Sequence, residues 1–119
     1  MSNLIFVYGT LRSNESRNNI LKDSEYIGIF KTAPKYTMIN LGSFPGMLMY
    51  GSTPITGEIY VVTNSVLKIL DQIEGHPDFY KREQIDIENF DKIQAYFLDK
   101  DKYFSYPEIE SGNWLDEFN

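Results

Sequence analysis

Cysteine is absent from this 119-residue sequence. Without thiols the chain can form neither a disulfide nor a zinc–thiolate site, and no cysteine can serve as a nucleophile. The sequence holds one histidine, His76, so a metal site built from histidines is not expected either. The composition therefore leads us to expect no metal and no cofactor.

Basic residues are few, with 11 lysines and arginines against 17 acidic residues and a formal net charge of −6. An acidic chain without a basic run is a poor match for phosphate backbones, so no nucleic acid partner is expected. Long apolar runs are also missing, since none approaches the roughly 18 residues of a membrane helix. The first residues do not resemble a signal sequence. We therefore expect a cytoplasmic protein with no membrane partner.

Apolar and aromatic residues are present in the amounts typical of a folded globular protein, at 42% and 15%. Aromatic side chains fit the half-buried surface of a sheet, so the interior should be rich in β-structure. A chain of this length can bury one ordinary core, and residues 1–119 are expected to form a single domain.

The spacing of apolar residues predicts two helices among several strands. The helices are expected at 14–22 and 66–75. The predicted strands are short apolar or alternating runs bounded by turn residues: 4–9, 25–33, 35–42, 44–51, 55–63, 80–90 and 92–100. Residues 102–119 are predicted to be an irregular aromatic segment laid over the body. The order β-α-β-β-β-β-α-β-β is typical of an α+β domain around one curved sheet.

The helix at 66–75, "VLKILDQIEG", carries an acidic residue where burial and the helix dipole both oppose it. Asn64 or Ser65 is expected to cap its start and Gly75 its end. Its apolar face is predicted to comprise Val66, Leu67, Ile69, Leu70 and Ile73. Glu74 lies at the edge of that face, in the last turn, where the dipole disfavours negative charge by about 0.3–1 kcal/mol.

Two interpretations of Glu74 are open from the sequence. Glutamate is seldom buried, so Glu74 could be a surface residue at a fraying helix end. Alternatively, "GHPDFY" (75–80) folds aromatic side chains back over the helix end. A carboxylate among apolar neighbours has a raised pKa and is suited to proton transfer.

The segment "VYGTLR" (7–12) is predicted to leave a strand and turn into a helix. Successive backbone N–H groups at such a turn can hold a carboxylate or a developing oxyanion, and Gly9 would allow close approach to the backbone. The alternative is a turn that ends the strand, capped by Thr10.

Other candidates are weaker on the sequence alone. His76, between Gly75 and Pro77, is expected on an exposed turn without a catalytic role. Asp71 is either solvated or a second carboxylate that raises the pKa of Glu74, and the solvated interpretation is favoured. Tyr80 could be a sheet residue or a site residue, and Arg82 could fold back toward Glu74. The turn "FPGM" (44–47) could form one wall of a pocket.

Taken together, several motifs resemble a known family. "VYGTLR", "FPGML", "TGEIYVVTNSVLKILDQIEGHPDFYKREQIDI" and "SGNW" occur in the order seen in the γ-glutamylcyclotransferase-like family, in particular its γ-glutamylamine cyclotransferase and AIG2-like group. The resemblance covers nearly the whole chain. It implies a β-α-β4-α-β2 domain with a small, partly closed mixed β-barrel flanked by two helices.

The resemblance also implies a reaction and its residues. The family cyclises a γ-glutamyl amine or γ-glutamyl amino acid to 5-oxoproline and releases the amine, without a metal or a covalent nucleophile. By resemblance, Glu74 matches the catalytic glutamate that acts as general acid and base. Tyr8, Gly9, Thr10 and Leu11 match the loop around the glutamyl end, and Tyr80 matches a tyrosine that closes the pocket.

One position departs from the family, and two alternatives to an enzyme stay open. Asn113 stands where bacterial relatives commonly have an aspartate, which bears on the packing of the tail. A binding module could keep the pocket for a small γ-glutamyl or carboxylate ligand without turnover. A negative charge at Glu74 would hinder mere carboxylate binding, which argues against that function. A purely structural interaction domain would hold no ligand in the pocket.

Overall fold

A computed structural model describes residues 2–118, which contain seven strands, two α-helices and two 3-10 helices. The strands are β1 (Ser2–Val7), β2 (Glu25–Lys31), β3 (Tyr36–Asn40), β4 (Pro45–Thr53), β5 (Thr56–Thr63), β6 (Lys81–Gln84) and β7 (Ile93–Phe97). The helices are α1 (Asn64–Glu74), α2 (Lys100–Tyr103), η1 (Asn18–Leu21) and η2 (Trp114–Phe118). Asn119, the last residue of the predicted tail, lies outside the described residues. Within residues 2–118, no helix is long and apolar enough to cross a membrane.

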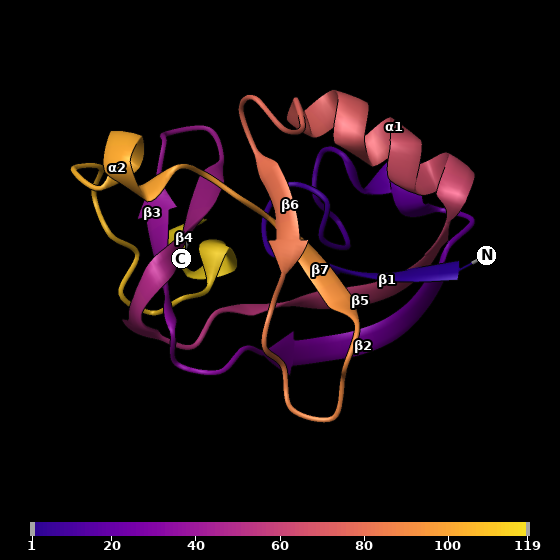
Figure 1. Cartoon of the computed structure of the whole chain (residues 1–119), viewed down its shortest axis with the longest axis horizontal. Helices are drawn as coiled ribbons and strands as arrows, with labels where there is room; N and C mark the ends of the chain where they lie inside the picture. Colours follow the sequence, from indigo (N-terminus) through magenta and orange to yellow (C-terminus); the bar gives the residue numbers. More distant parts are fainter. Residues whose placement is uncertain (1, 119) are drawn as a thin grey trace.

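Five strands form one mixed sheet in the order β2-β5-β1-β7-β6, and β3 and β4 form a separate antiparallel ribbon (Figure 1). β1 lies at the centre, antiparallel to β5 and parallel to β7. The α+β prediction is confirmed, and the predicted order of seven strands with a helix before the last two is found. The prediction of one sheet is wrong, because β3 and β4 form a sheet of their own, and the tail predicted to be irregular contains η2 and the end of α2. In the described part of the chain no ladder joins β2 to β6, so hydrogen bonds do not close the sheet into a barrel.

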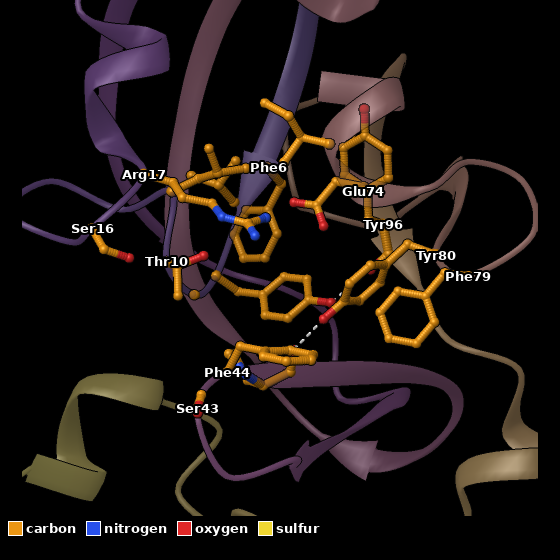
Figure 2. A pocket seen from close by; sticks show the side chains of 16 residues that line it. Phe6, Thr10, Ser16, Arg17, Ser43, Phe44, Glu74, Phe79, Tyr80 and Tyr96 are labelled. Carbon is orange, nitrogen blue, oxygen red and sulfur yellow. Dashed lines mark hydrogen bonds between the residues drawn. The ribbon is translucent and has the colours of Figure 1, made fainter. Parts of the chain in front are cut away.

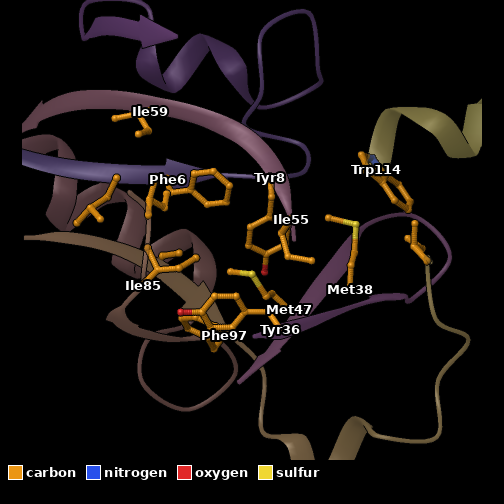
Figure 3. Close-up of a cluster of buried hydrophobic side chains, with 14 residues drawn as sticks. Phe6, Tyr8, Tyr36, Met38, Met47, Ile55, Ile59, Ile85, Phe97 and Trp114 are labelled. Atoms are coloured by element: carbon orange, nitrogen blue, oxygen red, sulfur yellow. The ribbon is translucent and has the colours of Figure 1, made fainter. Parts of the chain in front are cut away.

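Side chains from the two faces of β1 enter two separate apolar clusters, because successive residues of a strand point to opposite faces. Phe6 and Tyr8 pack with the ribbon residues Met38 and Met47 in the first cluster, which also includes Trp114 (Figure 3). The second cluster includes Leu70 of α1 and has the following buried members: Ile5, Val7, Leu11, Leu21, Ile39, Leu48, Tyr60, Val62, Leu70, Tyr80, Tyr96 and Leu98. The site described below lies at the edge of this second cluster.

α1 ends where the sequence predicts but is capped one residue earlier than expected. The hydroxyl of Thr63, not Asn64 or Ser65, accepts a hydrogen bond of 3.2 Å from the N–H of Val66. Gly75 ends the helix in the left-handed conformation, with φ of 69°, as predicted. Ile69, predicted on the apolar face, is 46% exposed.

Two predicted elements are shorter than expected. The helix predicted at 14–22 is reduced to the single 3-10 turn of η1. Asn14 has a positive φ of 67°, and the Asn18 amide bonds the carbonyl of Leu11, so side chains compete with a regular helix here. The strand predicted at 80–90 forms a ladder with β7 over Lys81–Gln84, followed by one further backbone hydrogen bond from Ile85 N to Ile93 O at 3.0 Å.

The C-terminal segment lies over the ribbon and β5, as predicted. Its backbone is tied to the body by three hydrogen bonds, from Asn40 N to Pro107 O (2.8 Å), from Ile109 N to Met38 O (2.7 Å) and from Thr56 N to Gly112 O (2.8 Å). The side chain of Asn113 accepts a bond from Arg12. The asparagine at this position therefore supports the packing of the tail.

Candidate active site

A pocket of about 290 Å³ opens where the end of β1, the C-terminus of α1 and the starts of β4 and β6 meet (Figure 2). All the candidate site residues carried over from the resemblance, which are Tyr8–Leu11, Glu74 and Tyr80, line it. The full lining is Phe6, Val7, Tyr8, Gly9, Thr10, Leu11, Ser16, Arg17, Ser43, Phe44, Pro45, Ile73, Glu74, Phe79, Tyr80 and Tyr96. The fold thus brings together segments that are far apart in the sequence.

A buried carboxylate anchors the loop that follows β1. Glu58 of β5 is 1% exposed and pairs with the guanidinium of Arg12, with Nε 3.0 Å from Oε2. The N–H of Ser13 (2.8 Å), the hydroxyl of Ser13 (3.1 Å) and the hydroxyl of Tyr60 (3.1 Å) also donate to Glu58. Arg12 Nη1 donates to Asn113 Oδ1 at 2.8 Å. Because a buried charge is tolerated only when it is paired and hydrogen-bonded, this network holds the loop in one position.

The loop lines the pocket and leaves some of its backbone donors unused within the described residues. Its carbonyls are occupied, since Gly9 O accepts from Arg12 N (3.0 Å) and Thr10 O accepts from Arg17 N (2.9 Å). Among residues 2–118, the N–H groups of Gly9, Thr10 and Leu11 donate no hydrogen bond. Three donors therefore remain for a ligand. The predicted helix does not follow this loop directly, so they do not form a helix N-terminus.

Gly9 is needed here for a reason other than the one predicted. A Cβ on Gly9 would lie 2.6 Å from Cγ and 2.8 Å from Cδ of Pro45. The absent side chain therefore lets the start of β4 approach the loop, and the space beside the Gly9 Cα is filled by Pro45. The prediction of a turn at 44–47 is wrong, since Pro45 begins β4 and pairs with Asn40 of β3. Phe44 and Pro45 form a wall of the pocket, as the sequence suggested.

Glu74, at the end of α1, points its half-buried carboxylate into the pocket (Figure 2). Burial raises the pKa of Glu74 to about 7, and the positive charge of Arg17 opposes this rise. Within residues 2–118 the carboxylate accepts no hydrogen bond and forms no ion pair. Because it is half-buried, Glu74 is not a surface residue at a fraying helix end, and burial raises its pKa in the direction expected from the sequence.

Two tyrosine hydroxyls donate hydrogen bonds to backbone carbonyls around the pocket. The hydroxyl of Tyr8 donates to Tyr96 O at 2.7 Å, and that of Tyr80 donates to Pro45 O at 2.6 Å. Burial first, and then the charge of Glu74, raises the pKa of Tyr80 above its usual range, and burial likewise raises that of Tyr8. Both groups therefore stay protonated and act as hydrogen-bond donors near neutral pH.

Asp71 and Arg82 form their own pair beside the pocket. Arg82 Nη1 donates to Asp71 Oδ2, and the hydroxyl of Tyr96 donates to Asp71 Oδ1 at 2.7 Å. Burial alone would raise the pKa of Asp71, but the bonds from Arg82 and Tyr96 hold it below its usual value. Asp71 is therefore paired rather than solvated, and the expectation that favoured a solvated residue is wrong. Because Arg82 is paired with Asp71, it does not form an ion pair with Glu74.

His76 has a structural role. Its Nδ1 accepts a hydrogen bond of 3.0 Å from the backbone N–H of Arg82, and the residue is half-buried rather than exposed. It does not line the pocket. In the described part of the chain, no three histidine or acidic side chains are grouped as a metal site would need.

Sequence reasoning missed several pocket residues. Arg17, Ser16 and Ser43 lie at the exposed rim, and Tyr96 lies in the buried part. No local pattern marks Arg17, because its approach to Glu74 depends on how the loop folds back over β1. Phe79 was signalled by the aromatic run after Gly75.

Comparisons with known proteins agree with this arrangement. The family model described as gamma-glutamyl cyclotransferase, AIG2-like, matches residues 5–116. A protein of Vibrio cholerae that carries a provisional gamma-glutamylcyclotransferase name is 37% identical over 114 residues, which are 96% of this chain and 96% of that protein. The gamma-glutamylcyclotransferase family protein YtfP of Escherichia coli is 30% identical over 112 residues, covering 94% of this chain and 96% of that one.

Solved structures show the same fold. The solution structure of Escherichia coli YtfP matches with a TM-score of 0.74 and 29% identity over 98% of this chain and 99% of that chain. The crystal structure of an AIG2-like protein from Mus musculus matches with a TM-score of 0.73 and 24% identity, over 92% and 87% of the two chains.

Proposed function

The chain belongs to the gamma-glutamyl cyclotransferase, AIG2-like family, and we propose that it cyclises a γ-glutamyl amine or γ-glutamyl amino acid to 5-oxoproline with release of the amine. Glu74 is the proposed general base and acid. The proposed substrate is a small molecule, the reaction uses no metal or cofactor, and its location is the cytoplasm. One domain, residues 1–119, would carry it out.

In the proposed reaction the substrate supplies its own nucleophile. The carboxylate of Glu74 takes a proton from the α-ammonium group, and the freed amine attacks the γ-carbonyl carbon. A C–N bond forms and closes a five-membered ring, while the carbonyl oxygen becomes an oxyanion. The N–H groups of Gly9, Thr10 and Leu11 are the donors available for that oxyanion or for the α-carboxylate.

Collapse of the intermediate breaks the bond between the γ-carbon and the leaving nitrogen. Glu74 gives its proton to that nitrogen and returns to the carboxylate. The α-ammonium group loses two protons in all, and the leaving amine gains both and departs as an ammonium ion near neutral pH. The pocket would hold the glutamyl chain in a folded conformation, with the amine close to the γ-carbonyl. This positioning lowers the free-energy barrier of ring closure, because less conformational entropy is lost in the transition state.

The observation that carries the proposal is the position of Glu74, whose half-buried carboxylate points into the pocket that the loop after β1 also lines (Figure 2). A general base works best when its pKa lies near the working pH, and burial raises that of Glu74 to about 7. A carboxylate with the ordinary value would be too weak a base for an ammonium group. A binding protein without turnover has no use for such a group, because a partly charged glutamate hinders the binding of a carboxylate ligand.

A screen of γ-glutamyl compounds tests the proposal. The purified protein is incubated with γ-glutamyl amino acids and γ-glutamyl alkylamides, and 5-oxoproline is measured by chromatography. We expect 5-oxoproline and free amine in equal amounts from at least one compound. Binding of these compounds without any 5-oxoproline would instead establish the non-catalytic binding function.

A further inference from the structure

The rim of the pocket carries a positive charge that the proposed reaction does not use. Of the lining residues within 2–118, Arg17 and Glu74 are the charged ones. Arg17 is exposed and lies just before η1, where its backbone N–H donates to Thr10 O at 2.9 Å. This hydrogen bond fixes the backbone position of Arg17 relative to the loop.

The guanidinium of Arg17 is available for a ligand, unlike those of the other arginines. Arg12 pairs with Glu58 and Arg82 pairs with Asp71. In the part of the chain that the structure describes, Arg17 forms no ion pair and its side chain donates no hydrogen bond. Figure 2 shows its guanidinium and the carboxylate of Glu74 directed into the same space from two sides. The two are close enough for the charge of Arg17 to lower the pKa of Glu74.

The pocket has a buried end and an open end, and Arg17 belongs to the open end. Tyr8, Leu11 and Tyr80 are buried, whereas Arg17 and Ser43 are exposed. In the proposed reaction the glutamyl part must contact Glu74 and the loop donors, because its atoms react. The amine part, which differs from one γ-glutamyl compound to another, then extends toward the rim.

We propose that Arg17 selects, among γ-glutamyl compounds, those whose amine part carries a carboxylate, namely γ-glutamyl amino acids and γ-glutamyl peptides. This inference rests on the proposed function. The carboxylate of a leaving α-amino acid is attached one carbon from the nitrogen that Glu74 protonates. A group placed there lies between Glu74 and the rim, where a guanidinium can bind it with two hydrogen bonds.

The glutamyl α-carboxylate is the competing partner for Arg17. The N–H groups of Gly9, Thr10 and Leu11 already offer donors on the buried side of the pocket for that group. Neutral and cationic amines would gain nothing from Arg17, and a cationic amine would be repelled. The structure thus favours the amino acid end of the substrate as the group that Arg17 binds.

The test uses two substrates that differ by one carboxylate. γ-Glutamyl-alanine and γ-glutamyl-ethylamide share the glutamyl part and the carbon skeleton nearest the leaving nitrogen. kcat/KM for 5-oxoproline release is measured on both with wild type, Arg17→Gln and Arg17→Lys. Lys22→Gln, an exposed lysine outside the pocket lining, is the matched control for the loss of one positive charge.

The readout is the ratio of the two kcat/KM values, alanine over ethylamide. Any change in the pKa of Glu74 acts on both substrates, so it cancels in the ratio. We expect Arg17→Gln to lower the ratio by about fivefold, which is the upper end of the effect that an exposed ion pair has on binding. Arg17→Lys should restore part of it, and Lys22→Gln should leave it unchanged.

Each other outcome overturns the inference in a recognisable way. If Arg17→Gln weakens turnover of both substrates equally, Arg17 binds the glutamyl carboxylate. If the ratio is near one in wild type and unchanged in Arg17→Gln, the amine part is not recognised by charge, while the cyclotransferase function stands. If wild type releases no 5-oxoproline from any compound in the screen, the proposed function fails and this inference fails with it.

Discussion

The hydroxyl of Tyr80 donates a hydrogen bond of 2.6 Å to the carbonyl oxygen of Pro45, and so joins the residue before β6 to the first residue of β4 across the pocket. Both ends of this bond are buried. Pro45 in turn fills the space beside Gly9. One side-chain hydrogen bond therefore fixes the distance between two walls of the pocket and the loop.

Replacing Tyr80 by phenylalanine should loosen this wall. The change removes the hydroxyl, leaves the buried carbonyl of Pro45 without its donor, and should lower the free energy of unfolding by about 1 kcal/mol. KM for the substrate should rise because the pocket is less well held. Urea unfolding and steady-state kinetics measure the two effects, with Tyr106→Phe, at an exposed site, as the control. Unchanged stability and KM would show that the bond does not hold the pocket.

Asp71→Asn should weaken the fold at neutral pH and much less in acid. The pKa of Asp71 is held below its usual value by Arg82 and Tyr96, so its charged form contributes stability above the unfolded value of 3.8. That contribution is lost as pH falls through the folded pKa. The half-buried pair should be worth about 1 kcal/mol.

Thermal melting of wild type and Asp71→Asn between pH 3 and pH 7 checks this. The difference in stability should be largest near pH 7 and should shrink below about pH 4. Asp23→Asn, which changes an exposed aspartate, is the control. A difference that stays constant over this range would mean that the charge of Asp71 contributes nothing.

The effect of Glu74 on stability should have the opposite pH dependence. Its folded pKa of about 7 lies above the unfolded value of 4.5. Wild type is therefore relatively most stable below pH 4.5 and loses stability as pH rises toward 7, where the folded carboxyl must ionise. Glu74→Gln has no such group, so its free energy of unfolding should rise relative to that of wild type by about 1–3 kcal/mol between pH 4.5 and pH 7.

Melting curves of the two proteins from pH 4 to pH 8 measure the gain. It should level off above pH 7, once the folded carboxyl is ionised. A difference that is flat, or that runs in the other direction, would show that Glu74 is solvated or paired in solution.

The loop donors can be tested by NMR. Adding glutamate to ¹⁵N-labelled protein should shift the amide signals of Gly9, Thr10 and Leu11 in proportion to occupancy, because a carboxylate oxygen accepts their hydrogen bonds within about 3.2 Å. The amide of Gly112, which donates to Ile109 O at 3.0 Å, is an internal control. Shifts confined to other parts of the pocket would remove the loop from the binding site.

The alternation of apolar residues predicted burial better than it predicted hydrogen bonding. Ile85 and Ile87 alternate and are buried, as expected of a strand. The ladder nevertheless ends at Gln84, and the chain turns back through Asn89, which has a φ of 74°. A period of two reports which side chains face the core, and it does not report where backbone pairing stops.

The candidate site could be predicted only where its residues are neighbours in the sequence. Glu74 was found because the apolar face of its helix and the aromatic run after Gly75 mark this position in the sequence as buried, and burial raises its pKa. The sequence left open whether Arg82 reaches Glu74; in the structure Arg82 pairs with Asp71, and the cation that acts on Glu74 is Arg17. Which of two arginines reaches a carboxylate is decided by tertiary folding, and no spacing in the sequence encodes it.

The most direct test of the account is the rate of 5-oxoproline release by Glu74→Gln, measured on a substrate that wild type accepts in the screen. Glutamine keeps the shape of the side chain and removes the proton acceptor, which should lower the rate by about 10²–10⁴-fold. Glu88→Gln, at an exposed site outside the pocket lining, is the matched control and should retain the wild-type rate. Near wild-type turnover by folded Glu74→Gln would contradict the assignment of Glu74 as the general base.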